Sequence, residues 1–415
     1  MLYFCGMGKP VIVFVGGGAA GFFGAANTAE LLPEAEIIIL EQAKQVLGKV
    51  KVSGGGRCNV TNGCFVPKEL SKHYPRGQRA LIGPFTRFMT GDTMEWFESR
   101  GVPLKIEPDN RVFPTSDNSQ SIIDCLVNSV DKYGVSIRKQ TRLVDMTQSA
   151  EGKWRLDLGK KGELLADHVV FTPGAAQPIW NLLEKLGHTI AAPVPSLFTF
   201  NIKDRRIDGL MGLSVPRAQV RIKTAKLKDE GPLLITHWGM SGPAVLKLSA
   251  WGARALAACN YQFQLEVCWL PDWKFGQVED HFQHLRSSQP KKQILSNAQF
   301  DLPSRLWKSL GEYVGIKPEQ RWAEITNKQI SAWVEELVRG QYPVNGKSTF
   351  KEEFVTCGGV DLKEVDFKTM GSKILPNVHF AGEVLDIDAI TGGFNFQAAW
   401  TGSWIAAQAL AESAQ

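Results

Sequence analysis

Two short apolar segments near the N-terminus flank a glycine-rich turn. Residues 11–15 (VIVFV) and 36–40 (EIIIL) are almost continuous runs of β-branched and other apolar side chains. Such runs are typical of central strands in a parallel sheet, because both faces of these strands are buried. Residues 22–32 (FFGAANTAELL) lie between them and have the composition of a helix. The pattern predicts a β-α-β unit.

Two further apolar segments lie far along the chain, and each runs into a glycine. Residues 164–174 (LLADHVVFTPG) contain one strand-like run, and residues 374–383 (ILPNVHFAGE) contain another. Gly392 and Gly393 then precede a long helix-like stretch that ends near Leu410. Strands that alternate with helices in this way predict an α/β fold with a parallel sheet.

The middle of the chain has a different pattern. Its first part, about 193–275, contains strand-like stretches such as FTFNIKD and YQFQLEVCWL. Its second part, about 276–345, has apolar residues at helical spacing. Trp307, Trp322 and Trp333 have the spacing of core residues within this helical part.

The composition narrows the class of protein. The chain has 415 residues, 44% of them hydrophobic, which is enough for two or three domains with large cores. Its 47 lysines and arginines and its 42 aspartates and glutamates form no block of like charge. A nucleic-acid-binding protein is expected to carry a concentrated basic stripe. We therefore expect an ordinary soluble surface and no nucleic-acid partner.

Cysteine usage and hydropathy indicate the compartment. Seven cysteines without regular spacing do not form the framework of a secreted, disulfide-rich protein. No apolar run approaches the ~20 residues of a membrane span. The first ten residues lack the apolar core of a signal peptide. We expect a cytoplasmic protein without a membrane partner, and none of these features sets its oligomeric state.

The turn after the first strand has a specific chemistry. Residues 16–21 (GGGAAG) match the G-x-G-x-x-G pattern of dinucleotide-binding folds, and Glu41 follows the second strand twenty residues later. In this pattern Gly16 allows the tight turn, Gly18 leaves room for a pyrophosphate, and Gly21 lets the helix pack closely on the strand. The helix N-terminus attracts the phosphates, and the acid accepts hydrogen bonds from ribose. We expect a dinucleotide site here.

The late glycine segments favour FAD over NAD. FAD domains of the glutathione-reductase type place a strand end such as residues 172–174 near the cofactor, and they hold the ribitol with a late glycine-acid pair, here Gly382 and Glu383. Their last helix points its N-terminus at the flavin, where its dipole stabilises negative charge on the reduced ring. Because both ends of the chain contribute, we expect residues 1–192 and 346–415 to form one discontinuous FAD-binding domain. Residues 193–345 would then be an insert domain.

Three segments together resemble one bacterial flavoprotein family. They are residues 52–62 (VSGGGRCNVTN), 235–249 (ITHWGMSGPAVLKLS) and 354–400. The family includes enzymes described as aminoacetone oxidases and as reductases of oxidised bile acids, and the resemblance covers nearly the whole chain. It implies an α/β fold with a Rossmann-like FAD-binding domain of the glutathione-reductase type, interrupted by an insert domain of β-barrel plus small helical bundle.

The resemblance also implies which residues bind FAD, without a covalent bond. They fall into the glycine turn with its acid, the loop around residues 49–59, the end of the third strand, and the segment that opens the last helix; the backbone of Leu143 lies where relatives contact the adenine. The expected FAD-binding residues are Gly16, Gly17, Gly18, Ala20, Gly21, Glu41, Gln42, Lys49, Gly54, Gly55, Gly56, Arg57, Cys58, Asn59, Leu143, Thr172, Pro173, Gly174, Gly382, Glu383, Asp386, Gly392, Gly393, Asn395, Phe396 and Gln397.

Residues 54–65 (GGGRCNVTNGCF) allow three interpretations. Flavin disulfide reductases carry a cysteine pair in a similar setting, but Cys58 and Cys64 are separated by five residues instead of four. Those reductases also need a second dinucleotide fingerprint, and none follows Gly174. A metal clip would need further Cys or His partners, so we expect no metal. We expect the glycines to form a backbone cradle, with Arg57 near the negative charge of the cofactor. A redox pair is the alternative.

Two residues are candidates for the substrate side. His237, within THWGMSGPAV, has the chemistry of a hydrogen-bond donor or a general acid near neutral pH. Arg111, within DNRVFPTSDN, has the charge to meet an anionic group. A purely structural role in a turn is the alternative for each residue.

These features predict an FAD-dependent oxidoreductase. NADH or NADPH would act as a transient reductant, and a small organic substrate or O2 would be reduced in a cleft between the FAD and insert domains. One rival is a thiol–disulfide flavoenzyme that uses Cys58 and Cys64. Another is an FAD-containing binding or RNA-associated protein in which the flavin is mainly structural.

Overall fold

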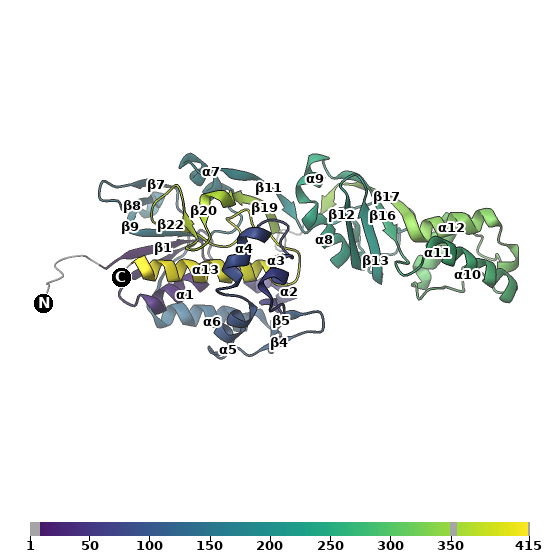
Figure 1. The fold of residues 1–415 in the computed structure, drawn as a ribbon, viewed down its shortest axis with the longest axis horizontal. Coiled ribbons are helices and arrows are strands. Elements are labelled where there is room, and N and C mark those ends of the chain that lie inside the picture. Colours follow the sequence, from purple (N-terminus) through teal and green to yellow (C-terminus); the bar gives the residue numbers. More distant parts are fainter. Residues whose placement is uncertain (1–8, 349–354, 414–415) are drawn as a thin grey trace. The chain divides into compact units, whose positions relative to one another are not determined.

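The computed structural model describes residues 9–348 and 355–413. The chain divides into two compact units: unit 1 comprises Met1–Pro193 and Lys351–Gln415, and unit 2 comprises Val194–Phe350. Figure 1 shows that the chain passes from unit 1 to unit 2 within β11 (Ile190–Ser196) and is again in unit 1 at β19, so segments from both halves of the sequence build unit 1.

Unit 1 is built around a parallel sheet of apolar strands. β1 (Val11–Val15) lies between β2 (Glu36–Leu40) and β10 (His168–Phe171), with β6 (Ser136–Arg138) beyond β2 and β22 (Val378–Phe380) beyond β10. All neighbouring pairs among these strands are parallel. The strands β1, β2 and β10 are almost wholly buried, which explains their continuous apolar runs.

The direction of strand addition reverses at β1. The chain first adds β2 and β6 on one side, and later adds β10 and β22 on the other side. In open α/β sheets such a reversal leaves a crevice outside the carboxyl ends of the strands, where ligands bind. Gly16 follows β1, Thr172 follows β10, and Gly382 comes soon after β22, so the three glycine turns expected from the sequence lie at this edge.

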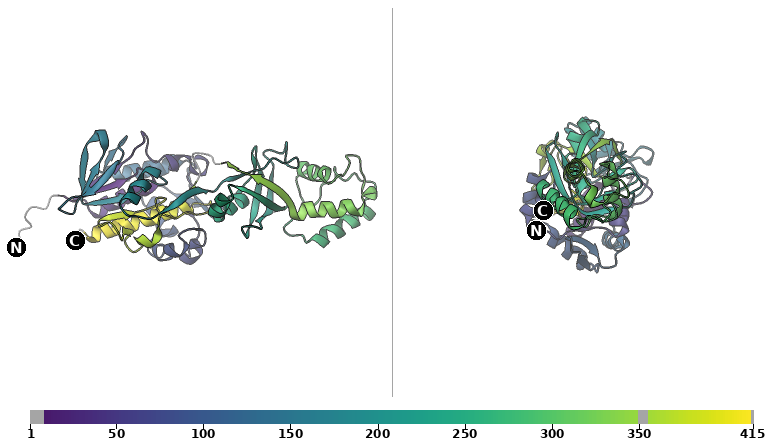
Figure 2. Two further views of the ribbon diagram at one scale, coloured as in Figure 1. Left: turned by 90° about the horizontal axis from the view of Figure 1, so that it is seen from above. Right: turned by 90° about the vertical axis from the view of Figure 1, so that its right-hand side faces the viewer.

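Two apolar helices pack against each other on unit 1. α13 (Phe394–Ser413), the yellow helix in Figures 1 and 2, contacts α1 (Ala19–Leu31) along its length. The side-chain hydroxyl of Ser403 donates to the Ala20 carbonyl at 2.8 Å. The rings of Phe23 and Trp400 lie 5.0 Å apart between the helices. Small residues on both helices allow this close approach, which brings the first turns of α1 against residues 399–403 of α13.

The sheet continues beyond β22 with β21 and β20, which pair antiparallel, and the other elements of unit 1 surround it. β3 and β4 pair with β5, β7 and β9 pair with β8, and β11 pairs with β19. Their bounds are α2 Gly48–Gly56, β3 Thr61–Asn62, α3 Pro67–Ser71, α4 Gln78–Phe85, α5 Thr90–Glu98, β4 Leu104–Ile106, β5 Arg111–Pro114, α6 Ser119–Lys132, β7 Asp145–Gln148, β8 Trp154–Asp157, β9 Glu163–Ala166, α7 Gln177–Lys185, β11 Ile190–Ser196, β19 Val355–Val360, β20 Val365–Asp366 and β21 Gly371–Ser372.

Unit 2 combines one antiparallel sheet with helices. The order of its strands is β17-β16-β13-β14-β15-β12-β18, and the paired neighbours run antiparallel. Their bounds are β12 Thr199–Asn201, β13 Ser214–Ile222, β14 Leu227–Ile235, β15 Gly239–Ser241, α8 Pro243–Trp251, α9 Ala253–Ala258, β16 Gln262–Cys268, α10 Phe275–Ser288, α11 Ser304–Tyr313, α12 Asn327–Arg339, β17 Gly340–Asn345 and β18 Lys347–Ser348.

The sequence of elements in unit 2 differs from the expected division into a strand-rich and a helical part. The helices α8 and α9 interrupt the strand-rich part, and β17 follows the last helix and pairs with β16. Residues 340–345 alternate between buried and less buried positions, as expected for a strand. These residues pair with β16, more than 70 positions earlier in the sequence. The helical spacing of the residues just before them therefore does not predict a strand here.

The helices of unit 2 enclose the tryptophans that the sequence placed in a core. Trp307, Trp322 and Trp333 are fully buried, which confirms that prediction. The rings of Trp307 and Trp333 lie 4.2 Å apart, and Phe282 contacts all three indoles. No helix in the described part of the chain is both long enough and apolar enough to cross a membrane.

A buried ion cluster ties the first loop of unit 2 to α12. The guanidinium of Arg206 donates to Glu336 Oε2 at 2.8 Å and to Asp204 Oδ2 at 2.6 Å. The Tyr342 hydroxyl donates to Glu336 Oε1 at 3.0 Å, and its ring lies 3.8 Å under the Arg206 guanidinium. Burial raises the pKa of Glu336, although Arg206 opposes this shift. The cluster is therefore satisfied internally but costly to break.

Candidate functional site

The three glycines of the N-terminal turn have different surroundings. A Cβ atom on Gly16 would lie 2.5 Å from Pro173 Cα, and one on Gly21 would lie 2.0 Å from the Gly16 carbonyl oxygen. These positions bring the start of α1 against the ends of β1 and β10. A Cβ atom on Gly18 would meet no atom within 4 Å. Space for a ligand group therefore lies beside Gly18 and not beside the other two glycines.

The N-terminus of α1 is available to an anion. Gly18 occupies the N-cap without a side-chain cap, and the first turn contains no acidic residue. The first backbone bond of the helix runs from Phe22 N–H to the Gly18 carbonyl, so the N–H groups of residues 19–21 have no partner within the helix. Free N–H groups at the positive end of a helix dipole suit a pyrophosphate.

Glu41 is held beside the glycine turn. Its Oε2 accepts from Gly17 N–H at 2.9 Å and its Oε1 from Ala43 N–H at 2.6 Å. Its carbonyl accepts from Thr141 N–H, which brings the segment that contains the buried Leu143 to the end of β2. This end of the cradle has the donor and acceptor groups that an adenosine needs, and Gln42 is exposed next to it.

Residues from three distant segments meet at the ends of β10 and β22. Lys49 Nζ lies 2.6 Å from Glu383 Oε2, and Glu383 Oε1 accepts from Thr356 N–H. A Cβ atom on Gly174 would lie 3.6 Å from the same Glu383 Oε2. The Thr172 hydroxyl donates to the Gly16 carbonyl at 3.0 Å, which fixes the β10 end against the glycine turn.

Consecutive glycines form a left-handed loop at the end of α2. Gly54, Gly55 and Gly56 have φ angles of 58°, 68° and 85°, which side chains other than glycine rarely adopt. Cβ atoms on Gly55 and Gly56 would meet no atom within 4 Å. The loop thus presents its backbone to open space, as a cradle for a cofactor requires.

The two cysteines that follow this loop are free thiols. Cys58 is fully buried, and burial raises its pKa to about 12. A thiol with this pKa stays protonated near neutral pH and is a poor nucleophile. The Cys64 thiol donates a long hydrogen bond to the Val66 carbonyl, with the sulfur 3.9 Å from the oxygen. The structure gives no support to the thiol–disulfide alternative.

Both arginines with an expected anionic partner are neutralised by carboxylates of unit 1. Arg57 Nη1 lies 2.7 Å from Glu107 Oε1 and 3.3 Å from Asp117 Oδ1, and its guanidinium stacks on Phe113 at 3.9 Å. Arg111 Nε donates to Asp109 Oδ2 at 2.7 Å. Carboxylates of unit 1 thus compensate both charges in the structure, and contact of Arg57 with the cofactor or of Arg111 with a substrate anion stays a prediction.

The start of α13 is positioned by side chains that are themselves occupied. Gln397 is fully buried and accepts from the Thr61 and Thr93 hydroxyls at 2.6 and 3.0 Å. Asn395 exchanges two hydrogen bonds with the Ala389 backbone. Their amides therefore shape the loop and do not point freely into a cavity. Phe396 likewise stacks on Trp400 at 5.5 Å, and Asp386 bonds Val360 through its N–H.

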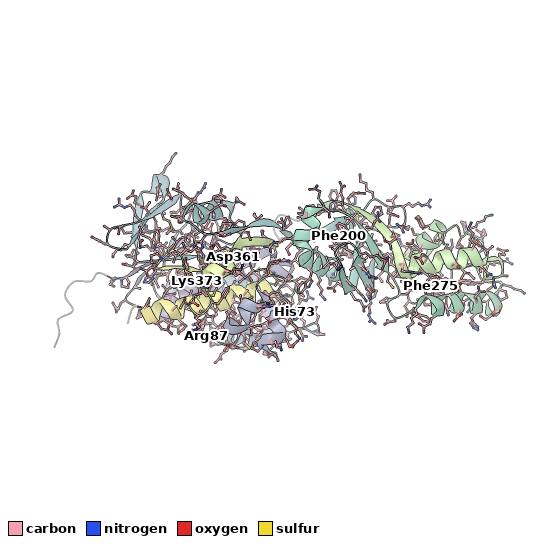
Figure 3. All side chains as sticks on the ribbon, turned by 45° about the horizontal axis from the view of Figure 1, so that its top comes forward. His73, Arg87, Phe200, Phe275, Asp361 and Lys373 are labelled. Carbon is pink, nitrogen blue, oxygen red and sulfur yellow. The ribbon has the colours of Figure 1, made fainter. Side chains whose placement is uncertain are left out.

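Three residues that anchor this segment, Asn62, His73 and Tyr74, were not expected as site residues, whereas Asn59 was. Asn62 Nδ2 donates to the Gly392 carbonyl at 3.1 Å, and the Tyr74 hydroxyl donates to the Phe394 carbonyl at 2.6 Å. His73, labelled in Figure 3, stacks on the Phe394 ring at 4.2 Å. In the orientation that satisfies its neighbours, the Asn59 amide accepts from Gly393 N–H at 2.9 Å. The pairing of these residues could not be read from the sequence, since each contact joins residues more than 300 positions apart.

His237 lies in unit 2, at the tip of the β14–β15 hairpin. Its side chain is exposed, and its Nδ1 lies 3.2 Å from Met211 Sδ. This position is compatible with contact to a substrate, and the role of His237 in a cleft stays a prediction.

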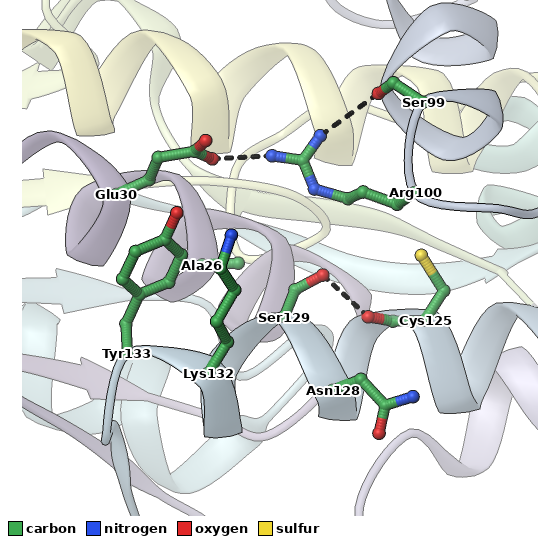
Figure 4. Close-up of a pocket in the computed structure, with 9 residues that line it drawn as sticks. All are labelled: Ala26, Glu30, Ser99, Arg100, Cys125, Asn128, Ser129, Lys132 and Tyr133. Atoms are coloured by element: carbon green, nitrogen blue, oxygen red, sulfur yellow. Dashed lines mark hydrogen bonds and ion pairs between the residues drawn. The ribbon is translucent and has the colours of Figure 1, made fainter.

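A separate hollow of unit 1 lies away from the cradle. It has a volume of about 550 Å3, and it lies beside the C-terminal half of α1 and the helix α6 (Figure 4). Arg100 and Glu30 form an ion pair at its edge, and Ser129 donates to the Cys125 carbonyl. None of its lining residues belongs to the cradle. Within residues 9–348 and 355–413, the His, Cys, Asp and Glu side chains form no group of three that could hold a metal ion.

A Rossmann-like α/β protein with a dinucleotide cradle is the class that this fold and site define. The family model described as the HI0933-like protein Rossmann domain matches residues 10–409, and the chain belongs to this family. The open space at Gly18 and the uncapped start of α1 fit FAD.

Curated relatives match the chain from end to end. A ribosomal RNA dihydrouridine synthase of Escherichia coli is 27% identical over 96% of this chain and 97% of its own length. The protein of the same name from Haemophilus influenzae is also 27% identical, over 96% and 98%. A 3-dehydro-bile acid delta(4,6)-reductase of Clostridium scindens is 26% identical over 97% and 99%.

Solved structures share the fold. The open conformation of a flavocytochrome c3 fumarate reductase has a TM-score of 0.51 at 15% identity and covers 98% of this chain and 78% of its own. A 3-ketosteroid-delta4-(5alpha)-dehydrogenase of Rhodococcus jostii has a TM-score of 0.50 at 12% identity and covers 97% and 98%. The family match and the curated relatives that match the chain from end to end identify it as an FAD-dependent oxidoreductase.

Proposed function

We propose that this protein reduces a carbon–carbon double bond that is conjugated to a carbonyl group, with NADH or NADPH as the transient electron donor. The observation that carries the proposal is the shared chemistry of relatives that match the whole chain. Formation of dihydrouridine saturates the uracil double bond next to a ring carbonyl. A delta(4,6)-reductase of a 3-dehydro acid saturates double bonds conjugated to a 3-oxo group. The substrates differ, but the bond is of one kind.

Residues of unit 1 have distinct roles in this proposal. The N–H groups of residues 19–21 bind the pyrophosphate, and Glu41 accepts from the ribose hydroxyls. Lys49 and Glu383, which pair at 2.6 Å at the sheet edge, would hold the ribitol side of the cofactor. The N-terminus of α13 would turn the positive end of its dipole toward the flavin ring of bound FAD. Bound FAD supplies the hydride-transfer chemistry, and the protein supplies orientation and electrostatics.

The proposed reductant is a nicotinamide that diffuses in from solution. The sequence contains one G-x-G-x-x-G turn, at residues 16–21, and no second one follows Gly174. That single cradle is assigned to FAD, so NADH or NADPH would visit the flavin without a dedicated Rossmann site.

The test is anaerobic flavin reduction followed by acceptor addition. The FAD-loaded protein is mixed with NADH or NADPH until its yellow colour is lost, and candidate acceptors are then added one at a time. We expect conjugated acceptors, such as a 3-oxo-delta4 steroid or uridine in RNA, to restore the colour. A matched ketone without the double bond is the control. The proposal would be refuted if the saturated ketone reoxidised the flavin as fast as the conjugated acceptors did. It would also be refuted if no organic acceptor reoxidised the flavin and O2 did.

A further inference from the structure

The two most exposed large apolar side chains in the described part of unit 2 are neighbours. Met211 is 60% exposed and Trp238 is 52% exposed, whereas Trp251 follows with 42%. His237 joins them: its Nδ1 lies 3.2 Å from Met211 Sδ, 26 positions away, and its ring stands nearly perpendicular to the Trp238 ring at 5.6 Å. We call Met211, His237 and Trp238 the exposed aromatic cluster.

The backbone around this cluster is firmly held. Thr236 N–H donates to the Gly239 carbonyl at 2.8 Å and closes the hairpin. The Trp238 carbonyl accepts from Ile202 N–H at 2.9 Å, and the Ile235 carbonyl accepts from Gly212 N–H at 2.9 Å. The indole is therefore presented to solvent from a loop that is fixed on both sides. Exposed apolar side chains on a rigid support are typical of a binding surface.

The net positive charge of the chain belongs to unit 2. Residues 194–350 contain 21 lysines and arginines against 14 aspartates and glutamates, a net charge of +7. The rest of the chain contains 26 against 28, a net charge of −2. Next to the cluster, Lys203 and Arg205 are exposed on the loop that begins after Ile202. The exposed carboxylate of that loop is Asp208, while Asp204 is paired with Arg206.

We propose that unit 2 binds single-stranded RNA, with a nucleobase stacked on Trp238 and phosphates near Lys203 and Arg205. An exposed indole stacks on any base, and nearby cations follow the backbone of the strand. A single carboxylate, as in a bile acid, needs only one or two cations, whereas a net charge of +7 suits a polyanion. The inference rests on the proposed function, because uracil carries the conjugated double bond. It replaces the expectation of no nucleic-acid partner. That expectation was based on the charge pattern of the whole sequence, whereas the proposal is based on the net charge of unit 2.

The test measures RNA affinity with the FAD-loaded full chain. Fluorescein-labelled single-stranded oligo(U) is titrated at several salt concentrations, and fluorescence anisotropy gives Kd. We expect Trp238→Ala to weaken binding about five- to one-hundred-fold, because the stack is lost, and Trp238→Phe to restore most of it. The double variant Lys203→Gln/Arg205→Gln should lower the slope of log Kd against log salt by about 1.4, since each phosphate contact contributes ~0.7 on a single strand.

Matched variants elsewhere on unit 2 are the controls. Trp251→Ala removes another exposed indole, and Lys291→Gln/Lys292→Gln removes two exposed charges; both should bind within twofold of wild type. Equal affinity of wild type and Trp238→Ala, or equal losses in Trp251→Ala, would overturn the inference. Lack of oligo(U) binding by a protein whose flavin a steroid enone reoxidises would refute RNA binding alone. Trp238-dependent RNA binding by a protein that reduces no conjugated acceptor would refute the proposed function alone.

Discussion

The cradle of unit 1 and the exposed aromatic cluster of unit 2 are two different ways to prepare a binding surface. The cradle uses backbone groups: open space at Gly18, an uncapped helix start, and left-handed glycines at residues 54–56. The cluster uses side chains that project from a fixed hairpin, in a unit with a net charge of +7.

This difference determines what a sequence can show. A backbone surface needs glycine at fixed spacing, because any side chain would fill the space that the ligand takes. A side-chain surface needs only that a few residues stay exposed, and many spacings satisfy that condition. The cofactor part therefore has a motif, whereas the proposed RNA-binding part has none.

The largest effect is expected at Gly18. Gly18→Val should reduce FAD content by orders of magnitude, because the side chain would occupy the pyrophosphate space. The fold should be nearly unaffected, since Gly18 has extended backbone angles and a Cβ there meets no atom within 4 Å. Absorbance after heat release measures FAD, and urea unfolding measures stability. Gly83→Ala, at another open glycine position, is the control.

Gly21→Ala is the comparison for a glycine that packing requires, since its Cβ would lie 2.0 Å from the Gly16 carbonyl oxygen. We expect this variant to lose both FAD and stability. A Gly18→Val protein that stays fully yellow would show that the pyrophosphate lies elsewhere.

The next largest effect separates the stabilities of the two units. Arg206→Met leaves Glu336 buried without its cation and should destabilise unit 2 by about 3–5 kcal/mol. FAD content should stay constant, because the cradle belongs to unit 1. Urea unfolding followed by tryptophan fluorescence and by flavin fluorescence checks this. Arg217→Met, which removes exposed ion pairs, should cost less than about 1 kcal/mol. Coincident loss of both signals in Arg206→Met would contradict independent stability.

A smaller effect concerns acid stability of unit 1. His379 is buried, and burial lowers its pKa to about 4 from an ordinary value of 6.5. The unfolded chain thus binds a proton more readily between these values, so stability is complete above pH 6.5 and falls as the pH drops toward 4. The loss approaches about 3 kcal/mol at pH 4. Urea midpoints at pH 7.5 and 5 should differ less in His379→Gln than in wild type. An unchanged pH dependence would assign the effect to other groups.

The smallest effect is expected at Cys64. Cys64→Ser should leave FAD content and reduction by NADH or NADPH close to wild type, because Cys64 forms no disulfide and the high pKa of Cys58 keeps that thiol protonated. Stopped-flow measurement of flavin reduction tests this. A new charge-transfer band that Cys64→Ser removes would restore the disulfide mechanism.

The fold of unit 1 could be predicted from the sequence because the features that indicate it lie close together in the chain. Apolar runs at residues 11–15 and 36–40, with glycines between them, predicted a Rossmann-like FAD-binding fold, which the family match confirms. The strand β17 gave no such signal, because its partner β16 lies far back in the chain.

The contacts of the site residues were harder to predict. Arg57 is of a residue type that often binds phosphate, yet in the structure it forms an ion pair with Glu107, 50 positions away. Gln397 follows the glycine pair of the last helix, yet Thr61 binds its amide in the core. In both residues the deciding partner is set by tertiary packing, and no spacing rule in one sequence specifies it.

The hydrogen bond between Thr61 and Gln397 joins positions 336 residues apart, and it has a consequence for the order in which the protein is made. Unit 2 is continuous in sequence and can complete its sheet while β22 and α13 are still unsynthesised. The cradle, with its N-terminal part at residues 16–21 and 54–56, is complete only after the last residues of the chain have left the ribosome. Firm capture of FAD is then the final step of folding, and a chain cut short before Gly392 would be colourless.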